Sequence, residues 1–191
     1  SMTALPIVET QAGDVSAYIP TNIISITDGQ LFLESELFFE GQRPAVNVGL
    51  SVSRVGGAAQ TKALKKASGA LRLDLAQYRE MEVFSQFSSD LDEATKKRLQ
   101  YGQGLMRLMR QPQYSPYTQA EETALLVAAL NKVMQDVPAN KINTFAKGML
   151  TYLKQHIPDV MDTIQASKTL TSDDQSAIIH AAKEYLKEFN G

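Results

Sequence analysis

Cysteine is absent from the 191 residues, and histidine occurs only twice, at His156 and His180. The lack of cysteine excludes disulfides, thiolate metal sites and a cysteine nucleophile. The two histidines lie on separate predicted helices and have no partners at ligand spacing, which argues against a zinc site or a Ser-His-Asp triad. The sequence therefore predicts no metal-binding residues.

Long apolar runs and a strong charge of one sign are also missing. The longest purely apolar run, Ala124 to Leu130, is far shorter than the roughly 20 residues that span a bilayer. The segment from Ser1 to Ala4 carries no signal-peptide pattern. The 19 basic and 21 acidic residues nearly balance, which leaves no electrostatic footprint for nucleic acid. We expect a soluble chain without membrane insertion or nucleic-acid binding, linked to membranes only through partners.

A phosphate-binding loop is missing too. No Gly-x-x-x-x-Gly-Lys-Ser/Thr occurs, so the chain lacks the backbone cradle that holds nucleotide phosphates. The string Leu71 to Asp74 is an apolar run that ends in a carboxylate, as in a magnesium-binding strand. It lies inside a helical pattern, however, and we interpret Asp74 as a charge on a helix surface.

The first 57 residues are typical of short strands, turns and short helices. Four apolar or β-branched segments are strand candidates: Leu5–Val8, Ile23–Thr27, Leu31–Leu33 and Val46–Val48. The segment Ile23–Thr27 also suits a short buried helix, because periodicity cannot separate the two over this length. Such strands need covering layers and neighbouring strands, and the rest of the chain supplies too few. We predict that residues 1–57 are the last part of an α/β domain whose earlier strands precede Ser1.

Residues 58–191 carry helical periodicity. Leu64 to Tyr78 predicts one long amphipathic helix, and a second helix is expected between Ser88–Asp90 and Pro112. Further helix starts are marked by two capping-box patterns and two prolines: Thr118 with Glu121, Ser172 with Gln175, Pro138 and Pro158. The predicted fold class is mixed, with a remnant of an α/β domain followed by an all-α helical bundle.

The loop from Gly49 to Gly57 presents one arginine, Arg54, between a strand candidate and the long helix. Glycines allow close backbone approach, and a guanidinium matches phosphate oxygens. Loops after strands of α/β sheets are common ligand sites. Two interpretations stay open from the pattern alone: Arg54 contacts a phosphate, or it pairs with a carboxylate while the glycines only form a turn.

Several long strings resemble the alpha-subunit family of the F-type ATP synthases. They are Ala4–Asp14, Ile23–Gln30, Arg43–Gly57, Leu71–Glu80 and Gln111–Pro116. The resemblance implies that residues 1–57 end a nucleotide-binding domain and that residues 58–191 form the C-terminal helical domain. In this family alpha and beta subunits alternate around a rotating shaft, and the complex makes ATP from ADP and phosphate using a proton gradient. Alpha is non-catalytic and regulatory, while beta carries the chemistry.

The resemblance also implies roles for single residues. Arg54 would be an arginine finger that reaches in trans into the catalytic site of the adjacent beta subunit, and Ser51 matches a position required for activity. Phe87 to Glu93 matches a loop that faces the gamma subunit of the shaft. Four residues match the surroundings of the adenine and ribose of alpha's own non-catalytic nucleotide: Arg43, Pro44, Gln111 and Gln113.

By the same resemblance, Mg-ATP or ADP would bind the longer subunit, whereas this chain alone would bind no cofactor and have no enzymatic activity. In a bacterium the complex would place it at the cytoplasmic face of the cell membrane. Glu40, Gln42 and Lys66–Ser68 depart from the family pattern. The alternative prediction is a free-standing helical interaction module that has its own partner and no nucleotide chemistry.

Overall fold

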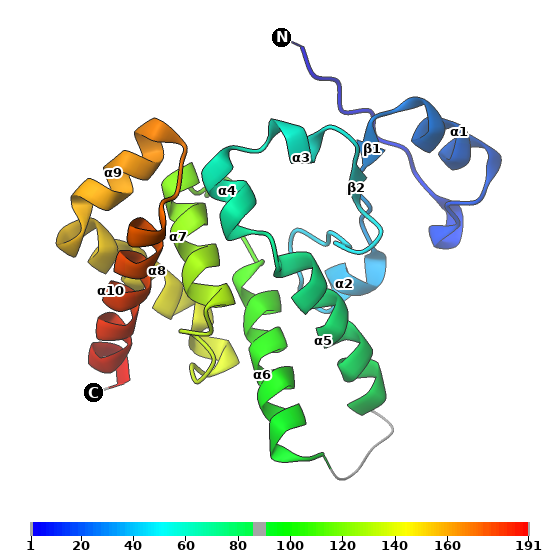
Figure 1. Ribbon diagram of the computed structural model, residues 1–191. Helices are drawn as coiled ribbons and strands as arrows, with labels where there is room; N and C mark the ends of the chain where they lie inside the picture. Colours follow the sequence, from blue (N-terminus) through cyan, green and yellow to red (C-terminus); the bar gives the residue numbers. More distant parts are fainter. Residues whose placement is uncertain (1, 86–90, 191) are drawn as a thin grey trace.

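The computed structural model describes residues 2–85 and 91–190. Its N-terminal elements, from α1 to β2, lie on one side of the molecule, and the bundle of α7 to α10 lies on the other (Figure 1). The hairpin of α5 and α6 projects between them, and α3 and α4 connect the two sides (Figure 1). The predicted fold class is confirmed: a small strand-containing part precedes a helical domain.

The N-terminal part contains one two-stranded antiparallel sheet. Its strands β1 and β2 pair in the register Gly29 to Ser53 and Gln30 to Val52. An isolated bridge joins Leu33 to Val46. The elements are η1 (Gln11–Gly13), α1 (Tyr18–Ile26), β1 (Gly29–Gln30), α2 (Ser35–Phe39), β2 (Val52–Ser53) and α3 (Gly56–Ala59).

None of the four strand candidates forms a regular strand: Leu31–Leu33 and Val46–Val48 contribute only the bridge between Leu33 and Val46, and β1 and β2 lie outside all four segments. Leu5–Val8 has no regular secondary structure. Most of Ile23–Thr27 belongs to α1, so the helical alternative holds, although the helix is largely exposed rather than buried. Pro20 in its first turn favours a helix start there, because proline has the helical φ and needs no hydrogen-bonded N–H at that point.

The helical domain buries one continuous core. Helix α10 packs against α8 and α7, and α7 packs against α4 and α9. The fully buried core side chains include Ala124, Phe145, Met149, Leu153, Ile164 and Ile178. The helices are α4 (Lys62–Ala67), α5 (Leu71–Ser85), α6 (Glu93–Leu108), α7 (Gln119–Leu130), α8 (Ile142–His156), α9 (Pro158–Ser167) and α10 (Ser172–Asn190), with η2 (Ala139–Lys141) before α8.

The predicted long helix from Leu64 to Tyr78 is interrupted. Helix α4 ends at Ala67, where Ser68 closes it by donating its backbone N–H to the Leu64 carbonyl. Helix α5 starts only at Leu71. Serine and the following Gly69 are weaker helix formers than alanine or leucine, so the apolar stripe continues across a break that periodicity alone does not reveal.

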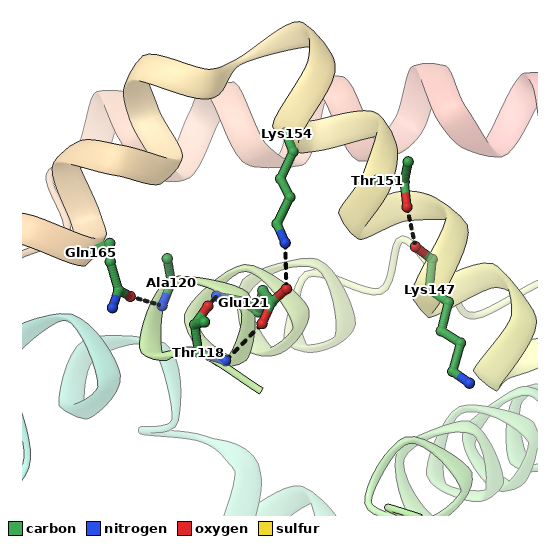
Figure 2. Close-up of polar contacts among 7 residues, drawn as sticks. All are labelled: Thr118, Ala120, Glu121, Lys147, Thr151, Lys154 and Gln165. Carbon is green, nitrogen blue, oxygen red and sulfur yellow. Dashed lines mark hydrogen bonds and ion pairs between the residues drawn. The ribbon is translucent and has the colours of Figure 1, made fainter. Parts of the chain in front are cut away.

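The start of α7 has the predicted capping box. The backbone N of Glu121 donates to Thr118 Oγ1, and the Glu121 carboxylate accepts from the backbone N of Thr118 at 2.7 Å. Figure 2 shows the same carboxylate paired with Lys154 of α8 (2.7 Å), while Gln165 of α9 accepts from the backbone N of Ala120. One helix start is thus bonded to the two helices that follow it.

Other helix boundaries follow the sequence closely, with two differences: Pro138 precedes η2 rather than lying in the first turn of a helix, and the second capping box is shifted. Helix α6 ends before Pro112, and α9 begins at Pro158, as predicted. The second capping box lies one residue earlier than Ser172 with Gln175. It joins Thr171 and Asp174, each of which bonds the backbone N–H of the other. Asp174 reaches that N–H as glutamate or glutamine does in the usual box.

Helix α4 is tied to the connection between α9 and α10. The backbone N of Ala63 donates to the carbonyl of Lys168 (3.0 Å), and Lys66 Nζ donates to the carbonyl of Leu170 (3.1 Å). Lys66 therefore bonds a segment that lies 104 residues further along the chain. Within the described ranges, no helix is long and apolar enough to cross a membrane.

Candidate functional site

Arg54 lies between β2 and α3, on a backbone that is closely held. Its backbone N donates to the carbonyl of Asp28 at 2.7 Å. Directly beside this bond, Gly29 has φ +148° and approaches Val52 so closely that a Cβ would lie 2.0 Å from the Val52 carbonyl oxygen. Only glycine permits that approach. The strand pairing that positions Arg54 therefore depends on Gly29.

The side chain of Arg54 is exposed. Within residues 2–85 and 91–190, no carboxylate lies within ion-pair distance of its guanidinium. Helix α3 begins two residues later at Gly56, whose backbone N donates to Ser53 Oγ at 2.7 Å. A fixed backbone thus carries a long, charged side chain toward solvent. In the described part of the chain, the guanidinium of Arg54 has no carboxylate partner, so the interpretation that it forms an ion pair finds no support there.

Ser51 is bonded inside the protein. Its Oγ donates to the carbonyl of Asn47 (2.6 Å) and accepts from the backbone N of Phe32 (3.0 Å). Asn47 is buried, donates to Glu34 through Nδ2 (2.7 Å) and accepts from the backbone N of Leu50. We call residues Gly49–Gly57, which carry Arg54, the arginine loop. The bonds of Ser51 and Asn47 connect the start of this loop to Phe32 and Glu34, which follow β1. The geometry makes Ser51 a positioning residue for the loop.

Three of the four predicted nucleotide-facing residues come together. The backbone N of Gln111 donates to the carbonyl of Arg43 at 2.9 Å, which brings the Arg43–Pro44 pair next to the segment after α6. The Arg43 guanidinium lies 4.4 Å from the centroid of the Phe38 ring, and Gln111 Nε2 donates to the carbonyl of Ser115. Gln113 is exposed two residues further on.

Arg110 and Gln42 join the same two segments, and no sequence motif marks Arg110. Arg110 Nε donates to Gln42 Oε1 at 3.0 Å, and its Nη2 donates to the carbonyl of Glu40 at 3.4 Å. Gln42 is buried. The only sequence signal was that Glu40 and Gln42 depart from the family pattern, and nothing in the spacing related them to Arg110.

Two predicted features remain, Asp74 and the loop Phe87 to Glu93. Asp74 is half-buried and accepts a hydrogen bond from the Tyr101 hydroxyl (2.6 Å), so its carboxylate has a structural partner. Within the described ranges, no group of His, Asp or Glu could hold a metal ion. Of the predicted shaft-facing loop Phe87 to Glu93, residues 87–90 lie outside the described residues. Asp92 caps α6 by accepting from the backbone N of Thr95.

Two protein-family models match this chain. Residues 1–53 match the nucleotide-binding domain of the ATP synthase alpha/beta family, and residues 60–185 match the C-terminal domain of the ATP synthase alpha/beta chains. The arginine loop lies at the junction of these two matches. The chain belongs to the ATP synthase alpha/beta family.

Within this family, the chain is similar to curated alpha subunits. The ATP synthase subunit alpha of Clostridium acetobutylicum is 54% identical over 189 residues, which cover 99% of this chain and 37% of the relative. The subunit alpha of Petrotoga mobilis is 53% identical over 189 residues, with 99% and 38% covered. The chain therefore spans less than two-fifths of the length of the curated relatives it matches.

Proposed function

We propose that this chain acts within an assembled F-type ATP synthase as the C-terminal part of a non-catalytic, regulatory alpha subunit. The complex would make ATP from ADP and phosphate using a proton gradient. In it, Arg54 would serve as the arginine finger of the catalytic site in the adjacent beta subunit. The proposal rests on one combination of features at Arg54. Its backbone is bonded to Asp28, and its guanidinium is exposed and has no carboxylate partner in the described part of the chain.

The chemistry of phosphoryl transfer explains why such a residue is useful. Negative charge spreads over the phosphoryl oxygens in the transition state, and a guanidinium held in place beforehand stabilises that charge without reorganisation. An arginine finger accelerates the reaction by ~10³–10⁵, which corresponds to roughly 4–7 kcal/mol of barrier. The bonds of Ser51 and the close approach at Gly29 would provide that preorganisation.

Replacement of Arg54 by alanine in the assembled complex tests this role. We expect steady-state ATP turnover to fall by about 10³-fold or more, while subunit assembly stays intact. Ser51→Ala should lower turnover less, because it loosens the loop and leaves the guanidinium. Arg98→Ala removes an exposed charge from α6 and serves as the control, with turnover unchanged. Near-normal turnover of Arg54→Ala in an intact complex would rule the role out.

The second part of the proposal concerns a nucleotide that alpha itself binds. Arg43, Pro44, Gln111 and Gln113 would form one wall around its adenine and ribose. The contacts fit a base: the bond from Gln111 to Arg43 fixes the two segments together, and amide groups supply donors and acceptors. They do not fit the phosphates or magnesium, because the phosphate loop motif is absent from the sequence. Mg-ATP or ADP would therefore need residues of the longer subunit.

The partners and domains follow from the same family membership. The two matched ranges leave residues 54–59 between them, which supports a domain boundary after Gly57. We propose that beta subunits flank this chain, that the α5–α6 hairpin presents Phe87 to Glu93 to the central shaft, and that the complex holds the chain at the membrane. The match over both domains favours this function over a free-standing helical module.

A further inference from the structure

A cavity of about 410 Å³ lies between α5, α6 and the segment of residues 42–49. This volume is in the range of sites that enclose small organic ligands. Most of its lining is aliphatic or thioether: Pro44, Val46, Val48, Leu75, Met106 and Met109. Flexible methionine side chains adapt to the shape of an apolar body. The inside of the cavity is therefore suited to a hydrocarbon chain.

Two arginines belong to the lining of this apolar cavity. Arg72 and Arg79 both line it, and they lie seven residues apart on α5, which places them on one face of the helix. No aspartate or glutamate belongs to the lining. Arg72 Nη2 donates to the carbonyl of Gly49 at 3.0 Å. Among the residues that the structure describes, neither guanidinium has a carboxylate within ion-pair distance.

The lining also indicates which ligands fit poorly. It contains no aromatic ring on which a base could stack. Its one amide side chain, Gln42, already accepts from Arg110 through Oε1. Of the four residues proposed to surround the adenine and ribose, only Pro44 takes part in the lining. A nucleotide base would find little to recognise it here.

We propose that this cavity binds a small amphipathic carboxylate, such as a medium-chain fatty acid. Its aliphatic body would lie against the valine and methionine side chains, and its carboxylate would accept hydrogen bonds from Arg72 and Arg79. A planar guanidinium matches the two oxygens of a carboxylate, and charge-assisted bonds of this kind are stronger than neutral ones.

Calorimetric titration of the 191-residue chain with decanoate tests the proposal. We expect saturable binding with a Kd on the order of 0.1 mM. Decanol has the same body without the charge and should bind about tenfold more weakly or worse, because bonds to a charged group are lost. Equal affinity for decanol and decanoate would contradict the role of the arginines, and no saturable binding of decanoate would contradict the site.

Three variants locate the binding. Arg79→Gln should weaken decanoate binding by about tenfold or more. Ala76→Leu adds volume at the lining, on an exposed helix position that tolerates leucine, and should weaken decanoate and decanol alike. Arg98→Gln removes the same charge from an exposed position outside the lining and should change nothing. Decanoate affinity that neither Arg79→Gln nor Ala76→Leu changes, with helicity intact by circular dichroism, would overturn the assignment.

Discussion

At the scale of single residues, Gly29 controls how Arg54 is held. We expect Gly29→Ala to disrupt the pairing of β1 with β2, because its Cβ would overlap the Val52 carbonyl and its φ of +148° is strained for any other residue. The local cost should be about 1–3 kcal/mol. The bond from the Arg54 N–H to Asp28 would then open more often, and amide hydrogen exchange at Arg54 should become faster in proportion.

Gly57 provides the matched control. An added Cβ there meets no atom within 4 Å, and its φ is not in the left-handed region. Gly57→Ala should leave exchange at Arg54 unchanged. If Gly29→Ala also left that exchange unchanged, the close approach to Val52 would not be what holds the loop.

At the scale of elements, the close contact of α5 with α6 depends on a glycine, which has no side chain, at position 102. Gly102 of α6 is buried against Tyr78 of α5, and a Cβ on it would lie 2.2 Å from Cδ2 of the tyrosine ring. Gly102→Ala should lower the free energy of unfolding by about 1–3 kcal/mol, because overpacking forces the helices apart. Chemical denaturation of the full chain measures this change.

Gly104 on the same helix separates packing from helix propensity. Its added Cβ would meet Ile142 Cδ1 at 3.6 Å, an ordinary contact. Gly104→Ala should therefore raise stability by up to about 1 kcal/mol, because alanine is the better helix former. Two changes of the same chemistry, two residues apart, should have opposite signs, and equal signs would contradict the packing explanation.

The polar link between α7 and α8 should depend on pH. Burial alone would raise the pKa of the Glu121 carboxyl, but hydrogen bonds from Lys154 and Thr118 outweigh it and hold that pKa below its ordinary value. The stability that Glu121 contributes is therefore present above the ordinary pKa of glutamate and is lost as the pH falls through the lowered pKa.

Glu121→Ala removes both the capping bond and the ion pair. We expect it to cost about 1–2 kcal/mol at neutral pH and clearly less in acid, once the pH has fallen below the lowered pKa and the carboxylate of the parent chain is protonated. Lys154→Met keeps the cap and should cost less than about 1 kcal/mol, since Lys154 is more than half exposed. Thermal unfolding of the three chains at neutral pH and in acid makes the comparison, and a cost of Glu121→Ala that is independent of pH would refute it.

Helices were predictable from the sequence where local signals agreed, and the N-terminal part was not. Thr118 with Glu121 marks a start of α7 that needs only neighbouring residues. The sequence does not reveal the break at Ser68, because the apolar stripe continues across weak helix formers, and it leaves the helical state of Ile23–Ile26 open, because periodicity cannot separate strand from helix over so short a segment. For the candidate site, sequence strings indicated Arg43, Arg54 and Gln111. The bond of Arg110 to Gln42 joins residues far apart in the chain, and periodicity carries no information about such pairs.

At the scale of the whole molecule, the proposed wall for adenine should be insufficient for binding. Titration of ATP into the 191-residue chain should give no saturable heat at micromolar concentrations, because the phosphate loop motif is absent. A micromolar Kd for ATP would contradict this expectation. The decanoate titration distinguishes the two sites, since the cavity shares only Pro44 with that wall.

The two bonds from α4 to the carbonyls of Lys168 and Leu170 have a consequence for biosynthesis. A ribosome releases the chain from its N-terminus, at about 5–20 residues per second. Helix α4 therefore leaves the ribosome some five to twenty seconds before the carbonyls that receive its hydrogen bonds. Helix α4, which follows the arginine loop, therefore stays without these two hydrogen bonds during that interval.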